Sequence, residues 1–256
     1  MDNRKILIFE NSFTLTNFLL KEWVRTVNEA VEDHNRFVVA LSGGKTPAEF
    51  YTRLSHLEEF DLWHKTHIFL ADEHFVPYDD PESNFRMIND NLLHYVPIPP
   101  QNVHPIKTKY ENVLIATEEY KHELIYFFEL KERKLPRFDL IMLGMGEDGQ
   151  VASLFPGEKG IDDPNRLTIP VSAYQSRTER VSLSLPVINN ARTVVFIIQG
   201  LRKADMVKKV LEENIDVPAQ HVHPADGRLM FLLDREAASR LSSPRKFTDH
   251  GEAISI

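Results

Sequence analysis

Short apolar runs alternate with amphipathic segments along most of the chain. Nearly continuous apolar runs of this length are typical of strands that are buried on both faces, whereas residues 180–186 alternate apolar and polar residues, as a half-exposed strand does. From Ser12 to Asp33, in contrast, apolar residues recur at helical spacing. The predicted strands cover residues 5–10, 36–41, 66–71, 138–143, 180–186, 193–200 and 227–234, and the predicted helices cover residues 12–33, 113–130, 201–214 and 235–241.

Strands that alternate with helices predict an α/β fold, with a mostly parallel sheet and helices on both of its faces. The chain has no internal repeat and no low-complexity linker. We therefore expect a single domain over residues 1–241, followed by a loosely held tail over residues 242–256. In a sheet of this kind, ligands bind beyond the carboxyl ends of the strands.

Composition and charge exclude several classes of function. The 256 residues include no cysteine, so disulfides, thiolate metal sites and thiol nucleophiles are ruled out. The net charge of −8 disfavours nucleic-acid binding, although a local pocket can still attract a small anion. The N-terminus lacks a signal-peptide pattern, and no apolar run is long enough to span a membrane. These features predict a soluble, cytoplasmic protein.

The first informative loop is LSGGKTPAEF, which follows the strand at residues 36–41. Gly43 and Gly44 allow the backbone to approach a ligand closely. Thr46 is a candidate N-cap for the next helix, with Glu49 closing a capping box. A helix N-terminus behind a glycine loop offers free N–H groups to an anion. The alternative is a tight strand-to-helix turn that binds nothing.

The second loop begins with the sequence ADEH after the strand at residues 66–71. Adjacent carboxylates such as Asp72 and Glu73 can have their pKa values driven apart in a cleft, which suits one of them to proton transfer. The alternative is that both carboxylates cap a turn and face water. His64, His67 and His74 lie close in sequence, but their spacing matches no known set of metal ligands, so we expect no metal site.

The third loop, GMGEDGQVASLFPG, follows the strand at residues 138–143. Its glycines match the letters of a dinucleotide fingerprint, but Pro156 leaves little room for the helix that this fingerprint requires. Two basic residues also lie near strand ends, namely Arg180 and Lys203. Either can meet a phosphate group, Arg as a planar fork and Lys as a point charge, or can simply face solvent.

Taken in order, these loops resemble those of the 6-phosphogluconolactonases, within the wider group that includes the glucosamine-6-phosphate deaminases. The similar segments are LSGGKTP, ADEHFVPYDDPESNFRM, VPIPPQNVHPI, FDLIMLGMGEDGQVASLFPG, RVSLSLPVINNARTVVFIIQG followed by RKA, and GRLMFLLDREAA. They extend from about residue 36 to residue 238. ASLFPG and SLSLPVINNAR resemble the lactonase branch more than the deaminase branch.

The resemblance implies a Rossmann-like layered domain that hydrolyses 6-phosphogluconolactone in the oxidative pentose phosphate pathway, without a metal or an organic cofactor. The implied partner is a small phosphosugar, and the protein is expected to be a monomer or a small homo-oligomer. The implied phosphate-binding residues are Ser42, Gly43, Gly44, Lys45, Thr46, Arg180 and Lys203. The implied substrate-binding loop residues are Glu73, Asn84, Gly146 and Gly149.

The chain departs from the family pattern at two positions. His74 stands where the family usually has an arginine near the phosphate, and Gln150 stands where it usually has the histidine that acts as general base. A glutamine side chain forms hydrogen bonds but has no useful basicity. The candidate catalytic residues are therefore Asp148, as the first replacement base, His74, as the second, and Asp72 and Gln150.

Three hypotheses follow from these departures. The chain is a working lactonase in which another group serves as the base, or it is a sugar-phosphate hydrolase or isomerase with a shifted substrate. The third hypothesis is a non-catalytic family member that binds a phosphosugar and acts as a sensor or partner protein.

Overall fold

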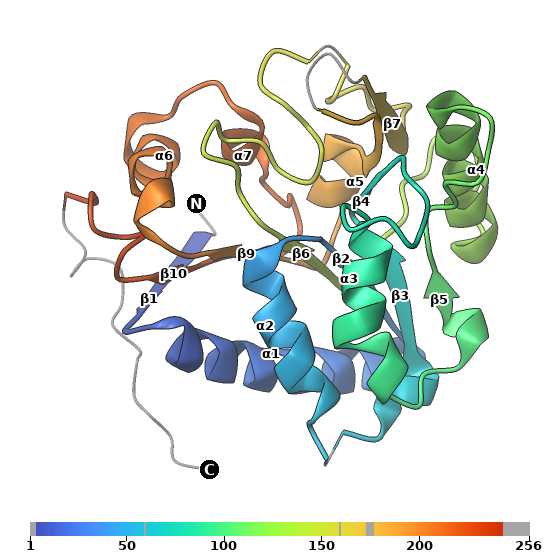
Figure 1. The fold of residues 1–256 in the computed structure, drawn as a ribbon, viewed down its shortest axis with the longest axis horizontal. Coiled ribbons are helices and arrows are strands. Elements are labelled where there is room, and N and C mark those ends of the chain that lie inside the picture. Colours follow the sequence, from blue (N-terminus) through green and yellow to red (C-terminus); the bar gives the residue numbers. More distant parts are fainter. Residues whose placement is uncertain (1–3, 59, 159, 173–176, 243–256) are drawn as a thin grey trace.

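The computed structural model describes residues 4–58, 60–158, 160–172 and 177–242 (Figure 1). The strands are β1 (Arg4–Phe9), β2 (Phe37–Leu41), β3 (Thr66–Leu70), β4 (Asp72–His74), β5 (Val103–His104), β6 (Leu140–Leu143), β7 (Thr168–Val171), β8 (Arg180–Leu183), β9 (Thr193–Ile198) and β10 (Arg228–Asp234). The α-helices are α1 (Ser12–His34), α2 (Lys45–Ser55), α3 (Asn84–Asn91), α4 (Val113–Phe127), α5 (Leu185–Asn189), α6 (Ala204–Lys208) and α7 (Pro218–His221). Short 3-10 turns cover Leu62–Lys65, Leu93–Tyr95, Pro100–Asn102 and Leu201–Lys203, and a π-helical turn covers Lys209–Glu213. The expected tail lies, from residue 243 onward, outside the described residues.

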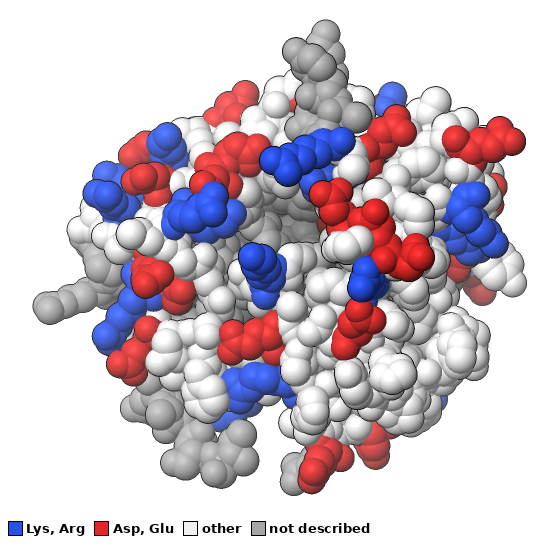
Figure 2. Space-filling view, in the orientation of Figure 1, with Lys and Arg blue, Asp and Glu red and all other residues white. Residues whose placement is uncertain are grey.

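A parallel sheet of seven strands forms the centre of the fold, in the order β1-β10-β9-β6-β2-β3-β5. Helix α1 runs beneath this sheet in Figure 1, and α6 and α7 lie above it. A second, antiparallel sheet has the order β4-β8-β7. The predicted α/β class, with a mostly parallel sheet between helices, is confirmed. Because the strands of the main sheet are parallel, their carboxyl ends meet at one edge, where a hollow opens among charged side chains (Figure 2).

The central strands are buried along their whole length, as their continuous apolar runs predict. Every residue of β2, β6 and β9 is buried, and the largest buried side chains include Trp23 of α1, Phe69 of β3 and Phe196 of β9. In the part of the chain that the structure describes, no helix has both the length and the apolar character needed to cross a membrane.

Two predicted elements differ from the structure. The strand expected at residues 180–186 ends at Leu183, because Ser184 accepts the N–H of Val187 and caps helix α5. This strand is also buried from Val181 to Leu183, so the expectation that it is half-exposed is wrong. The helix expected at residues 235–241 is a series of turns. The bond from the Ala238 N–H to the Asp234 carbonyl has helical spacing, but the next bonds along the chain span only three residues. The segment at residues 201–214 is helical in the main, but it combines 3-10, α and π turns.

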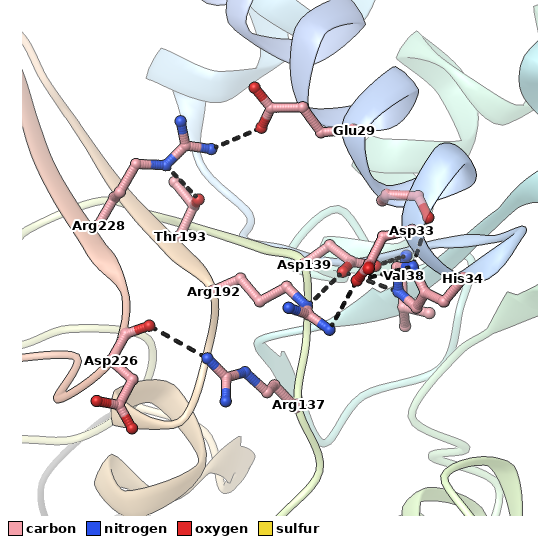
Figure 3. Close-up of polar contacts among 11 residues, drawn as sticks. Glu29, Asp33, His34, Val38, Arg137, Asp139, Arg192, Thr193, Asp226 and Arg228 are labelled. Carbon is pink, nitrogen blue, oxygen red and sulfur yellow. Dashed lines mark hydrogen bonds and ion pairs between the residues drawn. The ribbon is translucent and has the colours of Figure 1, made fainter.

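A buried carboxylate joins three elements at the amino edge of the sheet (Figure 3). Asp139 precedes β6, and its Oδ2 accepts the Val38 N–H of β2 at 2.8 Å. Its Oδ1 lies 3.1 Å from His34 Nε2, at the end of α1, and 3.3 Å from Arg192 Nε, just before β9. Burial raises the pKa of Asp139, while the Val38 N–H, His34 and Arg192 act in the opposite direction. One side chain thus fixes α1, β2 and β9 relative to one another.

We expect Asp139→Ala to lower the free energy of unfolding by about 1–3 kcal/mol, because it leaves the buried Val38 N–H without an acceptor. Asp33→Ala is the matched control, since Asp33 also pairs with Arg192 but is 63% exposed. This control is expected to cost less than about 1 kcal/mol. Urea denaturation of both variants measures the difference, and equal losses would contradict the role given to Asp139.

Candidate active site

A cavity of about 390 Å³ lies at the carboxyl edge of the parallel sheet, where the hollow opens in Figure 2. Its walls come from the three loops that follow β2, β3 and β6, from β8, and from the end of β9. The sequence-predicted site residues that line it are Ser42, Gly43, Gly44, Lys45, Thr46, Asp72, His74, Asn84, Gly146, Gln150, Arg180 and Lys203. Glu73, Asp148 and Gly149 do not line it.

The first wall is the glycine loop at the start of α2. The N-cap is Gly44, at a φ of +109° that favours glycine, so the predicted N-cap at Thr46 is wrong. Gly44 has no side chain to cap the helix, so the first N–H groups of α2 receive no side-chain cap bond from it. Ser42 is held in place, because its hydroxyl donates to the Met142 carbonyl at 2.7 Å. This wall offers hydrogen-bond donors to an anion.

Gly43 is the position in this loop where a side chain cannot fit. A Cβ at this position would lie 1.7 Å from Oδ1 of Asn84. Asn84 is buried, and its Nδ2 donates to the Asp72 carbonyl at 2.9 Å, so its side chain is not free to move aside. The glycine therefore allows the first wall to pack directly against the second.

The second wall is β4, which contains both predicted carboxylates. Both are buried, so the expectation that they face water is wrong, although Glu73 does accept N–H groups at the start of the next helix. Asp72 lines the cavity, and its Oδ2 accepts the Ser153 hydroxyl at 2.6 Å. Glu73 is fully buried and accepts the N–H groups of His74, Asn84 and Phe85 at 2.7–2.8 Å. Burial raises the pKa of Glu73 to about 7, although these three hydrogen bonds act to lower it. The carboxylate holds the start of α3 and does not line the cavity.

The third wall is the glycine-rich loop after β6. The Gly146 N–H donates to the Gln150 carbonyl at 2.9 Å, and Oδ1 of Asp148 accepts the Gln150 N–H at 3.0 Å. These bonds close a tight turn that directs Gln150 to the cavity lining, while Asp148 stays exposed outside it. Gly149 has a φ of +86° and packs against Val217, where a Cβ would lie 2.7 Å from the valine side chain. Gly149 is therefore required by the turn itself.

Three cations line the cavity without an ion-pair partner among the described residues: Lys45, Arg180 and Lys203. Nε of Arg180 is buried and makes no hydrogen bond within the described parts of the chain, and the guanidinium lies 5.7 Å from the ring of Phe155. Burial lowers the pKa of Lys203. In contrast, the neighbouring Arg202 is 85% exposed and pairs with Glu147 at 2.7 Å. Unpaired cations around a hollow indicate a site for an anionic group.

Some lining residues had no signal in the sequence. Met145, Ala152, Ile197 and Ile198 form an apolar part of the lining, and Gln199 follows β9. Gln199 follows a strand, and ligands bind beyond the carboxyl ends of strands, but nothing in the sequence distinguishes this glutamine from a solvent-facing residue. Within the described ranges, no group of three or more His, Asp or Glu side chains is arranged to hold a metal ion.

The chain is similar to a known protein family and to named relatives within it. Residues 10–231 match the family model described as glucosamine-6-phosphate isomerases/6-phosphogluconolactonase. A 6-phosphogluconolactonase from Synechocystis is 35% identical over 218 residues, which cover 84% of this chain and 89% of the relative.

Solved structures agree with this match. The 6-phosphogluconolactonase of Thermotoga maritima superposes with a TM-score of 0.77 at 30% identity and covers 90% of this chain and 99% of its own. The enzyme of the same name from Trypanosoma brucei superposes with a TM-score of 0.84 at 27% identity and covers 94% and 100%. The chain therefore belongs to the family of glucosamine-6-phosphate isomerases and 6-phosphogluconolactonases.

Proposed function

We propose that this chain hydrolyses 6-phosphogluconolactone to 6-phosphogluconate, the lactonase step of the oxidative pentose phosphate pathway. The observation that carries the proposal is the cavity beside a glycine loop in which three cations have no ion-pair partner within the described part of the chain. Relatives that match most of the chain bear the name 6-phosphogluconolactonase, which supports this substrate over other phosphosugars. We also infer a cytoplasmic protein, a monomer or small homo-oligomer, that acts on a small molecule and not on nucleic acid, in keeping with its net charge of −8.

In the proposed complex, the phosphate group of the sugar lies against the N-terminus of α2. Lys45, Arg180 and Lys203 neutralise its charge, and Thr46 adds a hydroxyl group. Ser42 lines the same wall, but its hydroxyl proton is already donated to the Met142 carbonyl. A phosphate bound at this end leaves the lactone ring to face the rest of the lining, where Asp72, His74 and Gln150 lie. Binding energy from the phosphate thus orients a carbonyl group that is remote from it.

Hydrolysis of a lactone requires a water molecule that loses a proton as it attacks the carbonyl carbon. Gln150 can orient this water through its amide but cannot accept the proton. Asp148, the first candidate base in the sequence, is exposed, is bonded to the Gln150 N–H and lies outside the cavity lining. These positions favour the lining residues over Asp148 for proton transfer.

Gln150 also supports a second candidate function. If no lining group accepts the proton, the same cavity binds a phosphosugar without turnover. Such a protein would act as a sensor or partner protein. A shifted substrate is the third candidate, because the family model covers glucosamine-6-phosphate isomerases as well as lactonases. Measurements of binding and of turnover separate these candidates.

We expect Arg180→Met and Lys203→Met each to weaken the binding of 6-phosphogluconate by about tenfold or more, because each removes a charge-assisted hydrogen bond to the phosphate. Arg202→Met is the matched control, since Arg202 adjoins Lys203 but does not line the cavity. Isothermal titration calorimetry measures the three affinities. A loss of affinity in the Arg202 variant as large as in the other two would contradict the assignment of the phosphate site.

We expect the unmodified protein to accelerate the loss of 6-phosphogluconolactone, generated in place and followed by NMR, above the spontaneous rate. Gln150→His is expected to raise the rate further, because it adds a base to the cavity lining. Binding of 6-phosphogluconate without any acceleration would favour the phosphosugar-binding protein. Release of ammonia from glucosamine 6-phosphate, with no lactone hydrolysis, would favour the deaminase-like enzyme.

A further inference from the structure

The cavity lining contains few groups that can accept a proton from water. Lys45, Arg180 and Lys203 are assigned to the phosphate group of the ligand, and Gln150 is an amide. The remaining candidates are Asp72 and His74.

Asp72 is already engaged as an acceptor. Its Oδ2 accepts the Ser153 hydroxyl at 2.6 Å, and Ser153 itself is fully buried. Nη1 of Arg180 lies 3.5 Å from the same hydroxyl. The Asp72 carboxylate therefore belongs to a buried network that also holds Arg180 in place.

His74 presents a different geometry, because its two ring nitrogens have different surroundings. Nδ1 lies 3.0 Å from Oγ1 of Thr178 and 3.9 Å from Oε2 of Glu82. Nε2 has no hydrogen-bond partner among the described residues. A ring whose Nδ1–H points to these oxygens carries its free lone pair on Nε2, the form that a general base requires.

The backbone holds this ring firmly against the cavity. His74 pairs with Arg180 across the antiparallel β4–β8 ladder, and its N–H donates to Oε1 of the buried Glu73 at 2.8 Å. The strand thus fixes the backbone of His74 at the cavity, and the contact of Nδ1 with Thr178 restrains the ring.

We propose that His74 is the general base of this enzyme and takes the role for which Gln150 is unsuited. This inference rests on the proposed lactone hydrolysis. In the attack step, Nε2 of His74 takes a proton from water as the water oxygen forms a bond to the lactone carbonyl carbon. The bond between this carbon and the ring oxygen then breaks, and the imidazolium returns the proton to the leaving oxygen. The product is the open-chain acid, and His74 is neutral again.

The electrostatic surroundings keep His74 in the neutral form at neutral pH. Burial, and then the charge of Arg180, lower the pKa of His74, while Asp72 and Asp80 act in the opposite direction. The fourth charged group that faces the ring is Glu82. With the net pKa below the ordinary value of about 6.5, the base is fully available at pH 7 and is lost only in more acidic solution.

The test is His74→Gln, which keeps a polar side chain but removes the basic nitrogen. We expect kcat to fall by about 10²–10⁴-fold, with affinity for 6-phosphogluconate kept within a few-fold. In the unmodified enzyme, kcat/KM is expected to fall as the pH drops below about 6.5, and this acid limb is expected to disappear in the variant. Adding Gln150→His to this variant is expected to restore part of the rate, because it supplies a base from another wall of the same cavity.

The matched control is His122→Gln on α4, where the side chain is 65% exposed and lies outside the cavity lining. It is expected to keep both the rate and the acid limb. An unchanged rate and acid limb in the His74 variant, or an acid limb removed by Asp72→Asn instead, would overturn the role of His74 while leaving lactone hydrolysis intact. No turnover by the unmodified protein would instead overturn the proposed function, and the inference with it.

Discussion

The buried carboxylate of Glu73 accepts hydrogen bonds from the backbone of its own strand and from the first residues of α3. The N–H groups of Asn84 and Phe85 in α3 donate to this carboxylate, and the Ser83 hydroxyl donates to its Oε2 at 3.1 Å. Because strand side chains alternate, fixing Glu73 on one face sets Asp72 and His74 on the other, at the cavity. Asn84 in turn packs against Gly43 and so fixes the distance between the second wall and the glycine loop.

Within the described part of the chain, the cations at the amino edge of the parallel sheet are paired with carboxylates, whereas those that line the cavity at the carboxyl edge are not. At the amino edge, Arg192 and Arg228 pair with carboxylates, and Asp139 ties the strands to α1 (Figure 3). At the carboxyl edge, the cations of the cavity have no carboxylate partner among the described residues. Ion pairs at the amino edge contribute to the framework, whereas unpaired cations at the carboxyl edge retain their attraction for a ligand.

The proposed mechanism depends on two positions, 74 and 150, at which the sequence is expected to depart from the family pattern. His74 and Gln150 line the same cavity from different walls, so a base that is lost from one wall can be supplied by the other. The proton-transfer group must reach the same water in either arrangement, and the phosphate site sets the position of the substrate that this water attacks. In the mechanism we propose, the scaffold keeps its reaction while the basic group changes its position in the sequence.

The sequence alone determined the fold class and most of the cavity lining. Continuous apolar runs predict buried parallel strands, and parallel strands bring their following loops to one edge. The resemblance of the loops to the 6-phosphogluconolactonases is what implies that residues as distant as Ser42 and Lys203 share one site, and both line the cavity. Local hydrogen bonding decided the elements that were predicted wrongly: Gly44 begins α2 in place of Thr46, and turns replace the helix expected after Asp234.

Only the tertiary structure decided which of two adjacent residues faces the ligand. Glu73 and His74 are neighbours in the sequence. The Glu73 carboxylate accepts backbone N–H groups from α3, whereas His74 lines the cavity. Asp148 and Gln150 are separated in the same way by a turn of the third loop. These choices depend on contacts between segments far apart in the chain, such as His74 with Thr178, and such contacts have no signature in the local pattern of residues.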